Sequence, residues 1–216
     1  MHGWTDLLGQ WPEVRQSYNV APTTEIAAFT AADSAGQAWQ GYPMRWGLVP
    51  GWSKTFDSKY ATFNARLESV ADKPTYRHAW KHQQRCLIPM AGYYEWQQQA
   101  DGSKQPFYIT DRNVGCLAAA GLFDYWGSED DRRQSCTMIT RPADQMMSQL
   151  HTRMPVMLQL DDAQEWLALD NEAAAEWLAR LISPDLVYWP VGPAVSNTRN
   201  NDARLIEPID TPAASE

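Results

Sequence analysis

The most restrictive feature of this sequence is a succession of short apolar segments separated by glycine, proline and acidic turn residues. Segments 25–32, 105–111 and 135–143 combine β-branched or aromatic residues with flanking turn signals, which is typical of β-strands. Helical spacing is confined to a few short stretches, chiefly 161–169 and 172–182. Strands and helices do not alternate regularly, which argues against a doubly wound parallel sheet. The pattern favours an α+β fold.

The length indicates one domain. The chain has 216 residues, and 44% of them are apolar, which is enough for a sizeable buried core. We find no repeat, no low-complexity linker and no break in composition. We therefore expect one domain over residues 1–210, followed by a frayed tail over 211–216.

Charge and cysteine content limit the classes of function. Eighteen basic and 26 acidic residues give a net charge of −8, so a nucleic-acid site would have to be a local basic patch. The three cysteines, Cys86, Cys116 and Cys136, are odd in number, widely spaced and without a CxxC pair, which argues against a disulfide framework or a zinc site. No apolar run is long enough for a membrane helix, and the start lacks the features of a signal peptide. We expect a cytoplasmic protein without a metal or cofactor.

The chain is unusually rich in tryptophan, with 11 in total. The interpretation that we favour is packing, with many indole rings half-buried because the N–H needs a partner. A second hypothesis is that one or two of them line a groove where nucleic-acid bases stack.

Three polar residues stand in contexts that are unusual for their type. Asn64 lies in strand-like sequence, and it is either a loop residue that bonds its own backbone or a functional amide. Glu95 lies between two aromatic residues, so it either faces water or sits in a desolvated setting that suits acid–base chemistry. His151 follows a helical segment, and it is either a helix-terminal histidine or an acid–base residue beside Arg153.

The arrangement of six segments resembles one known family. The segments are, in order, SYNVAPTT, RWGLVPGW, FNARLES, GYYEW, LHTRMPVML and PVGPAVSNTRNND. Together they resemble the SRAP (SOS-response-associated peptidase) family from about Ser17 to Ile209. The resemblance implies one α+β domain with a barrel-like, mostly antiparallel β core and short peripheral helices. It also implies a basic groove for single-stranded DNA and covalent attachment to abasic sites, and the peptidase name reflects self-processing.

The resemblance assigns roles to particular residues. Asn64 matches the family asparagine that contacts the lesion. Glu95 and His151 match the residues that move protons during imine formation and ring closure, so these three are the predicted catalytic residues.

The same match predicts a DNA-binding set. Pro22 would shape the wall of the site, and Arg66 would bind phosphate. Trp96 is a candidate for stacking and Arg153 for a phosphate contact. The implied partner is single-stranded DNA containing abasic sites, with no membrane, and the protein is expected to be a monomer.

The start of the chain departs from the family pattern. Family members begin Met-Cys-Gly-Arg-Phe, whereas this sequence begins Met1-His2-Gly3-Trp4, and residues 4–11 have the spacing of a helix. One hypothesis is that an upstream segment with the first strand and its cysteine is missing because of a wrongly assigned start codon. The other is a genuine short form that has lost its nucleophile.

The two hypotheses imply different chemistry. A thiazolidine needs an amine and a thiol on one residue, whereas an α-amine alone gives a reversible imine, with possible strand cleavage by β-elimination. The alternative function is a non-catalytic module that binds single-stranded DNA or another ligand. A true protease is disfavoured because no serine or cysteine stands beside a base.

Overall fold

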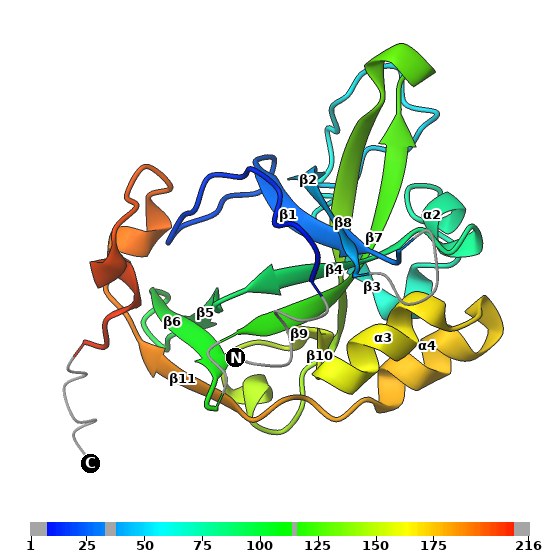
Figure 1. The fold of residues 1–216 in the computed structure, drawn as a ribbon. Helices are drawn as coiled ribbons and strands as arrows, with labels where there is room; N and C mark the ends of the chain where they lie inside the picture. The colour runs from blue at the N-terminus through cyan, green and yellow to red at the C-terminus, as the bar shows by residue number, and fades with distance from the viewer. Residues whose placement is uncertain (1–7, 33–37, 114–115, 210–216) are drawn as a thin grey trace.

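The core of the protein is a closed five-stranded barrel (Figure 1). The computed structural model describes residues 8–32, 38–113 and 116–209. The barrel strands, in spatial order, are β1 (Glu25–Thr30), β2 (Gln40–Trp46), β8 (Arg133–Pro142), β7 (Leu117–Trp126) and β4 (Arg85–Met90). Only the β2–β8 pair of this circuit is parallel, and the pairing of Phe29 with Leu87 closes β4 against β1. This architecture confirms the predicted α+β fold with a barrel-like, mostly antiparallel core.

The end of β8 carries further strands on both edges. β3 (Asn64–Arg66) pairs in parallel with β8, on the same edge as β2 but further along the strand, at Met138 to Thr140. On the other edge β9 (Arg153–Pro155) pairs with β8, and β10 (Met157–Leu158) pairs with β7. Val156, between them, makes backbone hydrogen bonds of 2.9 Å to both β7 and β8. The end of β8 thus brings together two segments that lie far apart in the sequence.

The barrel interior is narrow and is filled by alternate residues of every strand. These inward-facing residues include Ala28, Met44, Cys86, Ile88, Ala119, Phe123, Cys136 and Met138. Strand β7 crosses this space with small residues. A Cβ added at Gly121 would lie 2.8 Å from Sγ of Cys86 and 2.9 Å from Cδ1 of Ile88, so only glycine fits there without a shift.

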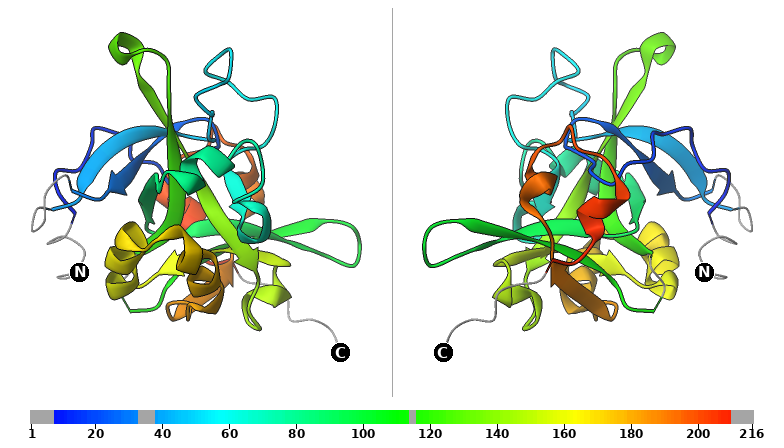
Figure 2. Two further views of the ribbon diagram at one scale, coloured as in Figure 1. Left: turned by 90° about the vertical axis from the view of Figure 1, so that its right-hand side faces the viewer. Right: turned by 90° about the vertical axis from the view of Figure 1, so that its left-hand side faces the viewer.

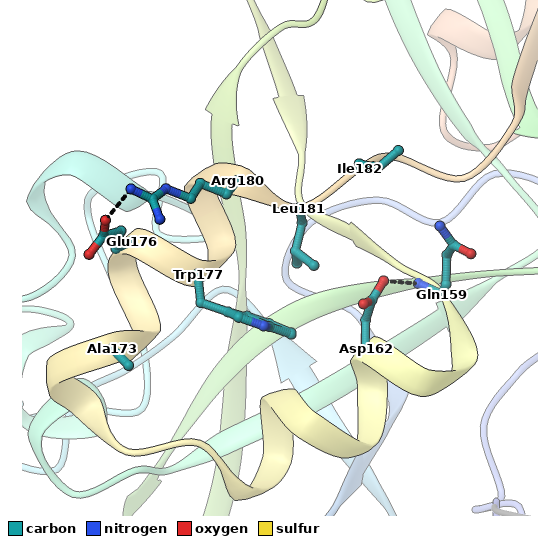
Figure 3. Close-up of a pocket in the computed structure, with 8 residues that line it drawn as sticks. All are labelled: Gln159, Asp162, Ala173, Glu176, Trp177, Arg180, Leu181 and Ile182. Carbon is teal, nitrogen blue, oxygen red and sulfur yellow. Dashed lines mark hydrogen bonds and ion pairs between the residues drawn. The ribbon is translucent and has the colours of Figure 1, made fainter.

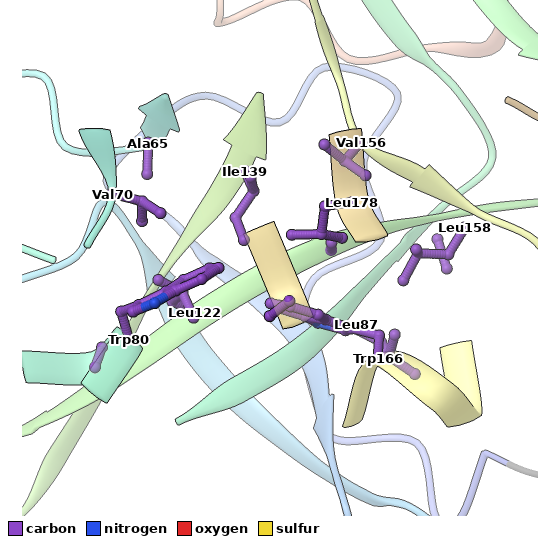
Figure 4. Close-up of a cluster of buried hydrophobic side chains, with 14 of the residues drawn as sticks. Ala65, Val70, Trp80, Leu87, Leu122, Ile139, Val156, Leu158, Trp166 and Leu178 are labelled. Carbon is purple, nitrogen blue, oxygen red and sulfur yellow. The ribbon is translucent and has the colours of Figure 1, made fainter. Parts of the chain in front are cut away.

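The outer face of the barrel is covered by helices α2 (Arg77–Lys81), α3 (Leu160–Ala168) and α4 (Asn171–Arg180). Figure 4 shows the side chains that fill this layer. Trp166 is fully buried, its ring centroid lies 6.3 Å from that of Trp80, and its indole N–H donates to a β4 carbonyl at 3.2 Å. For these two tryptophans the packing interpretation holds.

Two buried arginines donate hydrogen bonds to the carbonyls at the C-terminal ends of α3 and α4. The Arg85 guanidinium donates to the carbonyls of Trp166 and Leu169 at the end of α3. The Arg141 guanidinium donates to the carbonyls of Leu178 and Leu181 at the end of α4, at 3.1 and 2.6 Å. These carbonyls have no partner within their own helices, so the arginines tie each helix to a barrel strand.

A second sheet stands at the other side of the molecule (Figure 2). It contains β5 (Tyr93–Gln98), β6 (Lys104–Asp111) and β11 (Leu186–Pro190), all antiparallel. The 3-10 helices η4 (Pro193–Ser196) and η5 (Ala203–Ile206) pack on one of its faces.

The helix expected from the spacing of residues 4–11 is not found in the described residues. Residues 8–11 are not helical, because Leu8 instead bridges to Trp39 as a short parallel pair; residues 1–7 lie outside the described part. Residues 38–52 form one strand followed by a turn, since the chain leaves the sheet after Trp46. Helix α3 begins with a capping box, in which Gln159 is the N-cap residue and the Asp162 carboxylate accepts the Gln159 backbone N–H at 3.1 Å. Within the described ranges, no helix has the length and apolar character needed to span a bilayer.

Candidate functional site

Glu95 and His151 face each other between β5 and the turn that precedes β9. Nδ1 of His151 lies 3.9 Å from Oε2 of Glu95, close enough for an ion pair when the ring is protonated. The other carboxylate oxygen, Oε1, accepts the backbone N–H of Trp96 at 3.0 Å. The Glu95 side chain is 24% exposed and the His151 side chain is 45% exposed, so a substrate could reach both. The structure therefore brings together two of the three predicted catalytic residues.

One face of β5 holds this pair in place. Tyr93, Glu95 and Gln97 alternate along the strand and point to the same side. The Tyr93 hydroxyl contacts the sulfur of Met147 at 3.9 Å, and the Gln97 amide donates to the carbonyl of Gln149 at 2.7 Å. Both contacts reach the 3-10 helix η3 (Met147–Gln149), which leads directly into His151. They fix the separation between the carboxylate and the ring.

Asn64 and Arg66 lie at the start and end of β3, with exposed side chains on either side of buried Ala65. Asn64 pairs in register with Met138, so the two side chains share a face of the sheet. Met138 belongs to the cluster that fills the barrel, and Tyr93, two residues from Glu95, packs against the same cluster. The strand partner of Asn64 and a same-face neighbour of Glu95 thus contact one cluster.

An ion pair connects β3 to the His151 region. The Arg153 guanidinium donates to Oε1 and Oε2 of Glu68 at 2.7 and 3.0 Å and to the Thr140 carbonyl at 2.7 Å. Glu68 belongs to the 3-10 helix η1 (Leu67–Ser69), which directly follows β3. Hydrogen bonding from Arg153 lowers the pKa of the Glu68 carboxyl, although partial burial opposes this shift. Our sequence analysis missed Glu68 and Thr140; the only signal was the position of Glu68 two residues after Arg66.

Pro22 belongs to a loop that is held to the end of β2 by backbone hydrogen bonds. The backbone N–H of Thr23 donates to the Trp46 carbonyl at 2.7 Å, and the Trp46 N–H donates to Thr24 at 2.8 Å. The Trp46 indole in turn donates to the carbonyl that precedes Asn64, at 3.0 Å. Thr23 has a φ of +76°, which is rare for a β-branched residue and marks local backbone strain beside Pro22.

Trp96 does not join the Glu95 face. It points to the opposite side of β5, where its indole N–H donates to the Ser196 hydroxyl at 3.2 Å. There it packs beside Tyr94 on the small cluster around Val195. The predicted stacking role of Trp96 therefore has to be exerted away from the carboxylate.

Two of the three described cysteines are inaccessible, and the third is partly buried. Cys86 and Cys136 are fully buried inside the barrel, and burial raises the pKa of both thiols strongly. Cys116 is partly buried, and desolvation also raises the pKa of its thiol. Over the described ranges no three histidine, cysteine or acidic side chains are grouped as metal ligands.

A pocket of about 490 Å³ lies between α3 and α4 (Figure 3). Its apolar part is formed by Trp177, Leu181 and Ile182, and its polar rim includes Asp162 and Glu176. None of the predicted site residues lines it, and Arg180, which also lines it, forms an ion pair with Glu176.

Comparisons with known proteins agree with these features. Residues 5–198 match the family described as SOS response associated peptidase (SRAP). The chain is 33% identical over 200 residues to the abasic site processing protein YoaM of Bacillus subtilis, covering 90% of this chain and 86% of the relative. It is 32% identical over 238 residues to the abasic site processing protein HMCES of Xenopus tropicalis, covering 95% of this chain and 69% of the relative.

Solved structures share the fold. A crystal structure of a protein from Bordetella bronchiseptica superposes with a TM-score of 0.76 at 24% identity, covering 88% of this chain and 95% of that one. A protein from Bacteroides thetaiotaomicron gives a TM-score of 0.71 at 22% identity, covering 87% and 82%. At these identities the likeness supports the fold alone. The family match over most of the chain shows that this protein belongs to the SRAP family.

Proposed function

We propose that the protein recognises abasic sites in single-stranded DNA and forms a covalent adduct with the aldehyde of the ring-opened sugar. The observation that carries this proposal is the facing pair of Glu95 and His151. The names of the relatives, abasic site processing proteins, support the choice of substrate.

The pair suits the proton transfers of imine formation. When an amine adds to the aldehyde carbon, a proton must reach the sugar oxygen before it leaves as water, and the nitrogen must lose a proton. A carboxylate and an imidazole can share these tasks when both reach the reacting carbon. We assign Glu95 and His151 to them, and the exposed amide of Asn64 to a hydrogen bond with the sugar.

The DNA backbone would cross the face that carries β3. Arg66 is exposed there and has no carboxylate partner within hydrogen-bond distance among the described residues, so it is free to bind a phosphate. The neighbouring segment 47–63 exposes Trp52 at 67% and Tyr60 at 82%, interleaved with Lys54 and Lys59. Exposed aromatic rings beside basic side chains are typical of single-strand binding.

The nucleophile decides the nature of the adduct. An N-terminal cysteine ahead of the printed sequence would supply both amine and thiol and give a thiazolidine, in keeping with the family expectation. An α-amine without a thiol would stop at the imine. Borohydride reduces an imine to a stable amine but leaves a thiazolidine unchanged, so the mass of the adduct separates the two.

The test uses single-stranded DNA with one abasic site, incubated with the protein and analysed with and without borohydride. A matched DNA with a tetrahydrofuran analogue, which lacks the aldehyde, is the control. We expect an adduct with the aldehyde DNA alone and binding to both. No adduct, together with equal affinity for intact single-stranded DNA, would contradict the proposal.

One observation favours a second candidate, a binding module without covalent chemistry. Cys86 and Cys136 are buried, and desolvation raises the pKa of the partly buried Cys116 thiol, so none of the described cysteines is a ready nucleophile for a sugar aldehyde. Preferential binding to abasic DNA with no adduct, with or without borohydride, would select this candidate.

A further inference from the structure

The ion pair between Glu68 and Arg153 has a geometry that a surface salt bridge does not need. The Arg153 guanidinium uses both terminal nitrogens on the two carboxylate oxygens, and one of them also donates to the Thr140 carbonyl at 2.7 Å. Its third donor, Nε, is buried without a hydrogen-bond partner among the described residues. The orientation of the guanidinium therefore depends on Glu68 and Thr140 alone.

The backbone of the same arginine holds the His151 ring. The Arg153 N–H donates to Nδ1 of His151 at 3.1 Å, and the Arg153 carbonyl lies 3.2 Å from the same nitrogen. A neutral Nδ1 can accept the N–H, and a protonated Nδ1 can donate to the carbonyl. The backbone of one residue thus offers a partner to the ring in either protonation state.

The backbone N–H and C=O of Arg153 take no part in the β8–β9 ladder. Arg153 stands opposite Pro142, between two hydrogen-bonded positions of the ladder, so both groups point away from β8 and toward His151. The adjacent ladder bond runs from the Ala143 N–H to Thr152, at 3.0 Å. The side chain of Arg153 therefore adds a second attachment to β8, at the Thr140 carbonyl, beside the ladder bond of Thr152.

We propose that Glu68 is a positioning residue for His151. By fixing the Arg153 side chain it fixes the backbone of Arg153, and the N–H and C=O of this residue keep Nδ1 of His151 beside Glu95 while the ring gains and loses a proton. The role rests on the proposed function, because His151 then transfers protons during adduct formation. Glu68 itself need not touch the DNA.

The first test needs no DNA. Because the Arg153 N–H donates to the ring, its amide NMR signal should move when His151 is titrated. The Glu68→Gln side chain is neutral and cannot form the bidentate ion pair with Arg153. In this variant we expect the shift of the Arg153 amide signal to fall to half or less of its value in the unsubstituted protein. Glu68→Asp should recover part of it, and Glu172→Gln, an exposed change on α4, should leave it unchanged. A full movement in Glu68→Gln would overturn the proposal.

The second test measures adduct formation with abasic single-stranded DNA. We expect Glu68→Gln to lower the rate at saturating DNA about tenfold, because small misplacements of a catalytic group are costly, with the Kd unchanged within about twofold. An unchanged rate, or a loss of affinity that explains the whole effect, would overturn the positioning role. If the unsubstituted protein forms no adduct, the proposed function fails, and the NMR titration still decides whether Glu68 positions His151.

Discussion

Arginines serve two regions of this molecule in different ways. On the helix-covered side of the barrel, Arg85 and Arg141 are buried and donate to helix-terminal carbonyls. At the open end of β8, Arg153 also donates to a carbonyl, but its main partner is the half-exposed carboxylate of Glu68. Burial lowers the pKa of Arg85 to about 10, whereas hydrogen bonding from Arg153 lowers the pKa of Glu68.

The difference separates stability from function. A buried guanidinium leaves several carbonyls unsatisfied when it is removed, so its loss has to appear in the free energy of unfolding. A solvent-exposed ion pair contributes little to stability, so an elaborate one is better explained by what it orients. Substitutions in the two regions should therefore have effects of different kinds.

The largest effect should come from Arg85→Met. The substitution removes the donors to Trp166 and Leu169 at the end of α3 and a cation–π contact of 4.5 Å with the Trp166 ring. We expect the free energy of unfolding to fall by about 3 kcal/mol. Urea unfolding followed by tryptophan fluorescence measures this, with the exposed Arg112→Ala as the control. A loss below about 1 kcal/mol would remove the distinction between the two regions.

The next effect concerns catalysis rather than stability. Glu95→Gln keeps the hydrogen bond to the Trp96 N–H but cannot carry a proton to and from the substrate. We expect adduct formation to slow about 100-fold or more, with DNA affinity and unfolding free energy nearly unchanged. Single-turnover kinetics on abasic DNA measure the rate. Equal losses in rate and affinity would instead assign Glu95 a positional role.

The fold could be predicted further than the site. The strand segments and turn residues were sufficient for the α+β class, because alternation and turn chemistry act locally. The closure of the barrel by Phe29 and Leu87, and the parallel addition of β3 to β8, depend on pairings between distant segments. No local pattern encodes such pairings.

For the site, the family resemblance predicted Glu95 and His151, and the structure shows that these two side chains face each other. Trp96 shows the limit of this approach, because alternation along β5 turns it away from its neighbour. The sequence analysis did not single out Glu68, because its proposed role depends on a contact with Arg153, which lies 85 positions further along the chain. A single sequence does not display such a contact.

A smaller effect is expected from Arg66→Ala. If Arg66 binds one phosphate, its removal should weaken DNA binding about fivefold and reduce the salt slope of log Kd by about 0.7, the value for one contact with a single strand. Binding isotherms at several salt concentrations measure both, and Arg112→Ala is the matched control because it removes a cation near the second sheet. An unchanged slope would remove Arg66 from the phosphate contacts.

The smallest effect concerns the stability supplied by Glu68. Its carboxyl pKa is lowered from an ordinary value of 4.5, mainly by the hydrogen bond from Arg153, so the charged form favours the folded state. This stabilisation is fully present above pH 4.5 and is lost as the pH falls through the folded-state pKa. The side chain is 49% exposed, so solvent screening limits the contribution to less than about 1 kcal/mol. Glu68→Gln should therefore be slightly less stable at pH 7, and the difference should shrink below pH 4.5 in urea titrations. A difference above about 2 kcal/mol at pH 7 would mean that Glu68 supports the fold as Arg85 does, and that its effect on His151 is secondary.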